Sequence, residues 1–112
     1  MASAKSFSLS RFHLSAEAEL DLDDILTYLD QLPLEPGDRI AESLQGILES
    51  IGTQPLLGAP HSQLTRLLGQ EVRSRLVPPY RIYYRLGKNI PEIIAILHGA
   101  RDQTSILGNR FQ

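Results

Sequence analysis

Two consecutive stretches of this 112-residue chain carry apolar side chains at helical spacing, and each stretch is apolar on one side only. The apolar residues are Ala18, Leu22, Ile25, Leu26 and Leu29 in the first stretch and Ile40, Leu44, Ile47, Leu48 and Ile51 in the second. Ser15 is a good N-cap for a helix over residues 16–30, which the prolines of QLPLEPG end. A second helix runs from about Pro36 to Gly52. The short connection predicts an antiparallel helix hairpin, whose one-sided stripes must cover another layer.

That layer is predicted to be a β-sheet, because four segments have the alternation or the apolar content of strands. They are FSLSRFHL (7–14), EVRSRLV (71–77), YRIYYRL (80–86) and EIIAILH (92–98). The last three are joined by short turns and should form an antiparallel meander, in which EIIAILH has the continuous apolar run of a central strand.

The remaining segments complete the expected fold. Residues 53–70 form a long connection with room for one short helix near 62–68, and the tail is expected to add a half-turn of helix. The predicted order is β-α-α-β-β-β in a single α+β domain over residues 1–112. The helix hairpin should pack on one face of a small antiparallel sheet.

Composition excludes several classes of protein. The chain has no cysteine, so it has no disulfide, thiolate nucleophile or cysteine-ligated metal. His13, His61 and His98 have no ligand-like spacing, and we expect neither a metal nor another cofactor. No segment approaches the roughly 18 apolar residues of a membrane span, and the start does not resemble a signal peptide. We therefore expect a cytoplasmic protein without membrane contact.

The net charge of −2 hides an asymmetry between the two parts of the chain. Residues 1–65 hold 3 basic and 10 acidic side chains, whereas residues 66–101 hold 7 basic and 2 acidic ones. A basic second part indicates an acidic or polyanionic partner. The alternative is that the two parts neutralise each other across the fold.

Arginines alternate along two strands that should pair with each other. Arg81, Tyr83 and Arg85 share one face of the strand 80–86, and Arg73 and Arg75 share one face of the strand before it. The helices cannot comfortably cover these side chains, because a buried unpaired charge is costly. We therefore expect the arginines on the face opposite the hairpin, where they would bind phosphate or another anion.

Further charged and titratable groups follow the last strand. His98 and Arg101 lie where side chains can reach the rim of the arginine face. Each has a structural alternative, because Arg101 can pair with Asp102, and a histidine at a strand end is more often a packing residue than a catalyst. Arg81 can likewise form a salt bridge to the acidic first helix.

Four segments in this order resemble the toxins of the RelE/ParE superfamily. They are AEAELDLDDILTYL, QPLLG, VRSRLVPPYRIYYRL and IIAILHGARD, and the resemblance covers about residues 7–107. It implies the same β-α-α-β-β-β fold. It also implies an antitoxin, encoded beside the toxin, whose C-terminal segment wraps the toxin and silences it in a hetero-oligomeric complex.

The superfamily divides by target. RelE-like members cleave mRNA in the ribosomal A site, and ParE-like members poison DNA gyrase. The resemblance matches Arg81 to the arginine on the sheet of the cleaving branch and Arg101 to the arginine after its last strand. The tyrosine or histidine usual in the tail of that branch is missing, and Phe111 is the only aromatic residue there. The ending AILHGARD and the acid-faced hairpin are more similar to ParE.

We therefore expect a ParE-like toxin that inhibits gyrase by binding and not by chemistry of its own. The expected binding residues are Arg73, Arg75, Arg81, Tyr83, Arg85 and Arg101. One alternative is a ribosome-dependent, metal-free mRNA endonuclease with His98, Arg81 and Arg101 as catalytic residues, assisted by Arg73. Another is a degenerate toxin that only binds its antitoxin and co-represses its operon.

Overall fold

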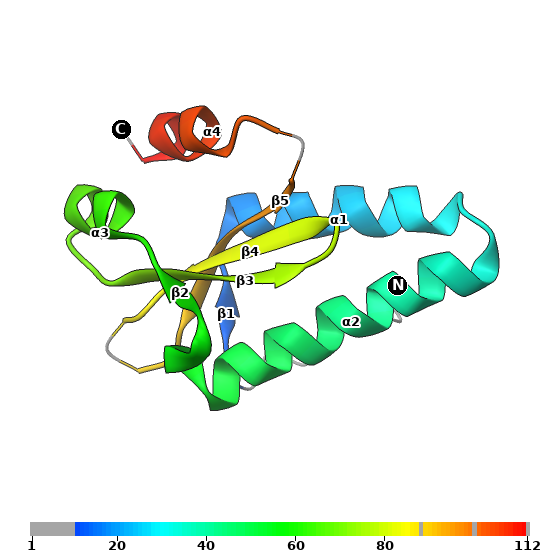
Figure 1. The fold of residues 1–112 in the computed structure, drawn as a ribbon, viewed down its shortest axis with the longest axis horizontal. Coiled ribbons are helices and arrows are strands. Elements are labelled where there is room, and N and C mark those ends of the chain that lie inside the picture. Colours follow the sequence, from blue (N-terminus) through cyan, green and yellow to red (C-terminus); the bar gives the residue numbers. More distant parts are fainter. Residues whose placement is uncertain (1–10, 88, 100, 112) are drawn as a thin grey trace.

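The computed structural model describes residues 11–87, 89–99 and 101–111. In chain order the elements are β1 (His13–Leu14), α1 (Ala16–Asp30), α2 (Leu34–Thr53), the 3₁₀ turn η2 (Pro55–Leu57), β2 (Ala59–Pro60), α3 (Ser62–Leu68), β3 (Val72–Val77), β4 (Tyr80–Arg85), β5 (Glu92–His98) and α4 (Gln103–Arg110). Figure 1 shows their arrangement, with an overall extent of 41 × 29 × 23 Å. The molecule is an α+β fold, as predicted, although residues 7–10 of the first expected strand lie outside the described residues.

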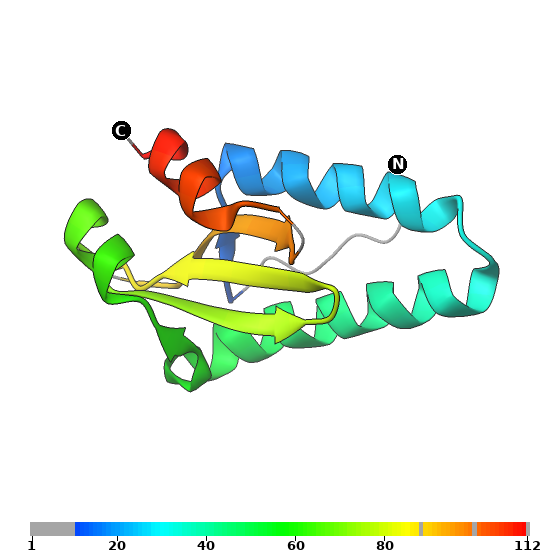
Figure 2. The ribbon, with the colours of Figure 1, turned by 45° about the horizontal axis from the view of Figure 1, so that its top comes forward.

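The helix hairpin forms where its sequence pattern predicts it. The amide of Ala18 donates to the side-chain hydroxyl of Ser15 at 3.1 Å, so Ser15 caps α1 as expected. Helix α2 begins at Leu34, two residues before the expected Pro36, because proline is tolerated in the first turn, where its missing N–H removes no intrahelical bond. A Cβ on Gly37 would lie 2.7 Å from the carbonyl oxygen of Leu29, so this glycine allows the two helices to approach closely. The helices run antiparallel and extend past the sheet (Figure 2).

The five strands form one mixed sheet in the order β1-β5-β4-β3-β2. Strands β3, β4 and β5 form the predicted antiparallel meander, and β2 extends it as a further antiparallel strand. Strand β1 instead runs parallel to β5, with Leu14 opposite Ile93. The sheet is therefore not wholly antiparallel. The hairpin lies between β1 and β2 in the sequence, and these two strands form the opposite edges of the sheet.

The main core lies between the hairpin and one face of the sheet. Its fully buried side chains include Leu44, Leu48 and Ile51 from α2 and Ile82 and Tyr84 from β4. These are the apolar stripe and the strand face that the sequence predicted to meet. Burial of this area supplies most of the driving force for folding.

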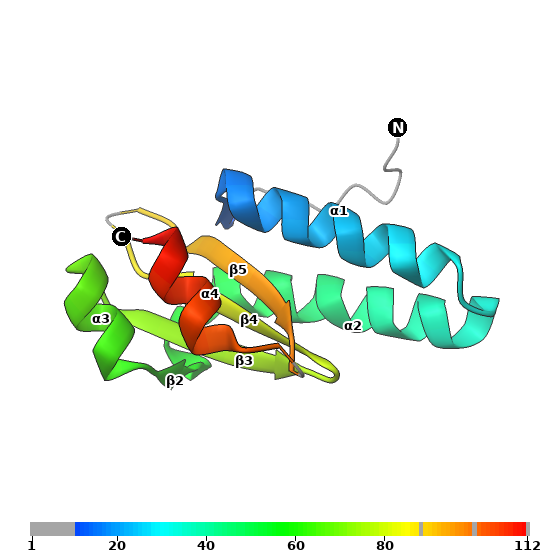
Figure 3. The same ribbon diagram turned by 90° about the horizontal axis from the view of Figure 1, so that it is seen from above.

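A second apolar cluster covers the opposite face of the sheet, which we call the far face. Its buried residues are Val72, Tyr83, Ile94, Ala95, Leu97 and Leu107. Leu64 and Leu68 of α3, together with Ile106 and Phe111 at α4, pack against them. Helices α3 and α4 lie at the end of the molecule away from the tip of the hairpin (Figures 1 and 3). The short helix expected near residues 62–68 is confirmed, whereas the predicted half-turn in the tail is an eight-residue helix.

Within the described part of the chain, no helix combines the length and the apolar character that crossing a membrane requires.

Candidate functional site

The register of β3 and β4 places the arginines on two different faces. Arg73 lies opposite Tyr84 and Arg75 lies opposite Ile82, whereas Arg81 lies opposite Leu76. Directly opposed residues of an antiparallel pair point to the same side of the sheet. Arg73 and Arg75 therefore lie on the hairpin side, and the expectation that they share a face with Arg81 is wrong.

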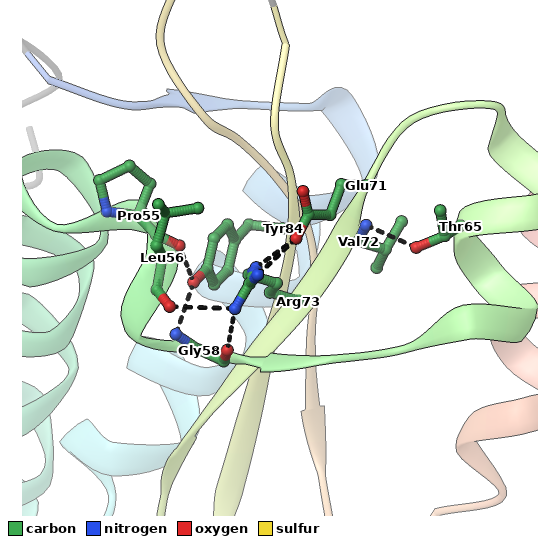
Figure 4. A network of polar contacts seen from close by, with 8 residues as sticks. All are labelled: Pro55, Leu56, Gly58, Thr65, Glu71, Val72, Arg73 and Tyr84. Atoms are coloured by element: carbon green, nitrogen blue, oxygen red, sulfur yellow. Dashed lines mark hydrogen bonds and ion pairs between the residues drawn. The ribbon is translucent and has the colours of Figure 1, made fainter.

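Arg73 is accommodated on the hairpin side because the protein satisfies its guanidinium (Figure 4). Its Nη1 donates to the carbonyl oxygens of Leu56 at 2.9 Å and Gly58 at 2.8 Å. Its Nε donates to Glu71 at 2.7 Å, with which it also forms an ion pair. The Tyr84 hydroxyl lies in the same group and accepts from the Gly58 amide at 3.1 Å. Arg73 thus fastens the η2 turn to the edge of the sheet.

Arg75 and Arg85 also have partners inside the molecule. Arg75 donates to the hydroxyl of Ser50 in α2 at 3.0 Å, which confirms that its side chain lies on the hairpin side. Arg85 donates through Nε to Glu92 at 2.7 Å and forms an ion pair with the same carboxylate, directly across the strand pair. The charge of Arg85 is therefore compensated within the sheet.

The far face contains a cavity of about 730 Å³. Three residues of the expected binding set line it, namely Arg81, Tyr83 and Arg101. His61 and Gln103 line it as well. The walls are α3, β4 and the segment between β5 and α4, so residues distant in the sequence meet here.

Three connected polar side chains, which we call the polar floor, lie at this cavity: Arg81 and His61 line it, and the buried Ser74 joins them. Arg81 Nη1 donates to the hydroxyl of Ser74 at 3.1 Å, and Ser74 Oγ lies 2.7 Å from His61 Nε2. Because Ser74 accepts from the guanidinium, its own proton is free to be donated to a neutral His61. Burial, and then the positive charge of Arg81, lower the pKa of His61 below its usual value, which agrees with a neutral ring. Ser74 itself is 2% exposed.

Tyr83 connects the polar floor to helix α4. Its hydroxyl donates to the side-chain oxygen of Gln103, and its ring centre lies 5.3 Å from that of His61. Burial raises the pKa of Tyr83, so the hydroxyl keeps its proton at neutral pH. Tyr83 is 5% exposed, so the far face is not the solvated surface that the sequence predicted. Its ring belongs to the second apolar cluster.

His98 is not brought to this cavity with the arginines. It pairs with Tyr80 across β4 and β5, and the two rings meet edge to face at 5.6 Å. The side chain of Tyr80 is part of the hairpin core, so His98 points to the hairpin side. Asp102 caps α4 by accepting from the amide of Ser105 at 3.3 Å. The far-face cavity therefore unites Arg81 with Arg101 and leaves His98 on the other side of the sheet.

In residues 11–87, 89–99 and 101–111, no group of three or more histidine, aspartate or glutamate side chains could hold a metal ion.

Two residues of the polar floor were missed in the sequence. His61 lies in the long connection, and Ser74 alternates with Arg73 and Arg75, so the face expected for these arginines would place Ser74 on the hairpin side. A signal for the face of Ser74 does exist, because only Pro78 and Pro79 separate β3 from β4, and so short a connection makes Val77 and Tyr80 direct partners. His61 has no such signal, since its place depends on the pairing of β2 with β3.

Comparisons with known proteins agree on one family. Residues 12–103 match the family model described as the ParE toxin of the type II toxin-antitoxin system, parDE. Toxin ParE1 of Caulobacter vibrioides (strain ATCC 19089 / CIP 103742 / CB 15) is 33% identical over 98 residues, which cover 87% of this chain and 97% of that toxin. The chromosomal ParDE toxin–antitoxin system from P. aeruginosa has the same fold, with a TM-score of 0.59 at 17% identity over 78% of this chain and 92% of that one. The chain belongs to the ParE toxin family of type II toxin–antitoxin systems.

Proposed function

We propose that this toxin inhibits DNA gyrase by binding to it, and that a cognate antitoxin neutralises it. Family membership supports gyrase as the target, because ParE-like members of the superfamily poison this enzyme. A neighbouring solved structure that is itself a ParDE toxin–antitoxin system supports the antitoxin as a partner. The working complex would then be a hetero-oligomer of toxin and antitoxin.

We propose that the toxin acts by binding because His98 is separated from Arg81 and Arg101, the two arginines of the cavity. Metal-free RNA cleavage requires proton-transfer groups and charge-stabilising groups around one phosphate. Arg81 and Arg101 line the far-face cavity, whereas His98 pairs with Tyr80 on the hairpin side. This placement disfavours the mRNA endonuclease that these three residues were expected to form.

Three of the expected binding arginines remain available for an acidic partner. Within the described residues, Arg75, Arg81 and Arg101 have no carboxylate within ion-pair distance, whereas Arg73 and Arg85 each have one. A guanidinium that is already paired gains little from a second carboxylate. We therefore assign the attraction of an acidic partner surface to Arg75, Arg81 and Arg101.

The hairpin also exposes large apolar side chains. Leu20, Tyr28 and Leu34 are 65%, 54% and 82% exposed. Exposed apolar side chains of this size give the hairpin a surface that a partner protein can cover. We assign this surface to the antitoxin, whose apolar residues would cover the hairpin while its acidic residues meet the arginines.

A supercoiling assay with purified, antitoxin-free protein tests the target. Gyrase should lose supercoiling activity as the toxin is titrated in, and cleaved DNA should accumulate. Addition of the antitoxin encoded beside the toxin should restore supercoiling. Full gyrase activity at saturating concentrations of folded protein would refute the proposal.

The variant His98→Ala separates binding from catalysis. It should inhibit gyrase as well as the unmodified chain does, because His98 lies on the other side of the sheet from Arg81 and Arg101. If His98→Ala instead abolished growth arrest while the protein stayed folded and kept its antitoxin, the ribosome-dependent endonuclease would be favoured. A toxin inactive on gyrase and mRNA that still bound its antitoxin would be a degenerate family member.

A further inference from the structure

Arg81 is a half-buried cation for which the described part of the chain provides no carboxylate. The described ion pairs use Arg39, Arg73, Arg85, Arg110 and His13 as their cations. The partner of Arg81 is the neutral hydroxyl of Ser74. A guanidinium held partly away from water without a counter-charge is costly unless an anion completes it.

The surroundings hold this guanidinium in place and leave most of its donors to a ligand. Ser74 accepts from Nη1 and is fixed in turn by His61 at 2.7 Å. A guanidinium has five N–H donors, and a single one is used in the described contacts of Arg81. The planar donor group is therefore pre-organised at the floor of the cavity. Little ordering would accompany the arrival of a ligand.

The charges around the cavity favour an anion. Arg101 lies on the wall formed by the segment before α4, so two arginines line one space. Asp102 is the acidic residue of this lining, and its carboxylate is engaged by the amide of Ser105 at 3.3 Å and the hydroxyl of Ser105 at 2.9 Å. The remaining field at the floor is positive.

The size of the cavity and its apolar wall indicate what kind of molecule the anionic group would belong to. The volume of about 730 Å³ is in the usual range for small-molecule sites. Leu64, Leu76 and Leu107 contribute apolar surface to the lining. Arginine donors match the oxygens of a phosphate group geometrically.

We propose that the far-face cavity binds a small phosphorylated molecule of nucleotide size, with its phosphate on Arg81 and its organic part along the leucine wall. The site shares Arg81 and Arg101 with the surface assigned above to an acidic partner, but its test needs neither that partner nor gyrase. Its ligand would bind whether or not the toxin acts on gyrase, so the two proposals succeed or fail separately.

Calorimetric titration of the purified chain tests this site directly. The probes are inorganic phosphate, adenosine 5′-monophosphate and adenosine, in a buffer without other multivalent anions. The nucleotide should bind saturably and more tightly than inorganic phosphate, and adenosine should bind much more weakly than the nucleotide. Equal binding of nucleotide and adenosine, or no saturable binding of either phosphate probe, would overturn the proposal.

Two arginine variants identify the residue responsible. Arg81→Gln should weaken nucleotide binding by about tenfold or more, since it removes a charge-assisted contact. Arg75→Gln is the matched control, because it removes the same charge from the neighbouring strand on the hairpin side. It should leave the dissociation constant unchanged. Equal losses in the two variants would indicate attraction by overall charge and would refute a specific site. Far-UV circular dichroism establishes that both variants are folded.

Sulfate provides a second measurement, because it keeps its charge throughout the pH range in which histidine titrates. Among the described residues, the titratable or charged groups that line this cavity with His61 are Arg81 and Tyr83 on β4 and Arg101 and Asp102 before α4. Burial and Arg81 lower the pKa of His61 in the protein alone, and a bound dianion would raise it. Sulfate affinity should therefore rise as the pH falls through the pKa that His61 has with the anion bound. His61→Asn should abolish this rise, and an unchanged pH dependence in that variant would exclude His61 from the site.

Discussion

At the scale of single residues, Arg73 and Arg75 show how differently two arginines of one strand can be used. Both point to the hairpin side of β3, two positions apart. Arg73 is bonded to two backbone carbonyls and to Glu71, and its side chain is 19% exposed. Arg75 contacts one serine hydroxyl and has no described carboxylate partner. The first is a structural residue, and the second keeps its charge for a partner.

Replacement of these two arginines should therefore affect stability unequally. Arg73→Ala leaves two carbonyl groups and a carboxylate without their donor, and should lower the free energy of unfolding by about 2 kcal/mol. Arg75→Ala removes one hydrogen bond to a neutral hydroxyl and should cost less than about 1 kcal/mol. Urea unfolding followed by circular dichroism measures both values. Similar losses for the two variants would contradict the structural role assigned to Arg73.

At the scale of elements, helix α4 is attached to the rest of the fold by an ion pair at the edge of a strand. Strand β1 pairs with β5 only as far as Ile93, so the edge of β5 beyond that residue has no strand partner. Asp21 of α1 accepts from the amide of Ile96 at 2.9 Å, and Arg110 of α4 donates to the carbonyl of Ile94 at 3.1 Å. Asp21 and Arg110 also pair with each other at 2.7 Å. The pair replaces a missing strand and closes this edge.

A double-mutant cycle on Asp21 and Arg110 tests this attachment. Asp21→Ala or Arg110→Ala leaves the other charge poorly compensated in a largely buried position. Each variant should lower the free energy of unfolding by about 3 kcal/mol. The double variant should cost clearly less than the sum, with a coupling energy of about 1 kcal/mol or more. Thermal or urea unfolding of the four proteins gives this energy. Strictly additive losses would mean that the two residues act separately.

At the scale of the whole molecule, one sheet carries two apolar clusters on its opposite faces. Strand β4 supplies Ile82 and Tyr84 to the hairpin core and Tyr83 to the far-face cluster. Strand β5 likewise supplies Ile93 and Ile96 to the hairpin core. It supplies Ile94, Ala95 and Leu97 to the far-face cluster. Because the strands are shared, neither cluster can be lost while the other stays intact.

The fold should therefore unfold as one cooperative unit even when the smaller cluster is weakened. Leu107→Ala in the far-face cluster and Leu44→Ala in the hairpin core should each lower stability by about 2–5 kcal/mol. Both should retain a single transition. Tyrosine fluorescence and far-UV circular dichroism, recorded on the same urea series, should give coincident curves. Separate transitions in Leu107→Ala would show that α3 and α4 form an independent unit.

The sequence by itself determined the features that depend on neighbours in the chain. Helix α1 begins and ends at the predicted residues, because its cap at Ser15 and its apolar stripe lie within a few turns of one another. The antiparallel meander follows from short turns between β-forming segments. The resemblance to the RelE/ParE superfamily is confirmed at the level of the ParE family.

Only the tertiary structure decided which side chains meet. The faces of Arg73 and Arg75 follow from strand register, the parallel pairing of β1 follows from the path of the hairpin, and helix α4 is held by a contact to Asp21, 89 residues away. His61, Ser74 and Arg81 come from three strands or their ends, and no spacing in the sequence relates them. Periodicity and capping report local backbone geometry, whereas register and packing are set by contacts between distant segments. The helices could therefore be predicted from the sequence, but the cavity could not.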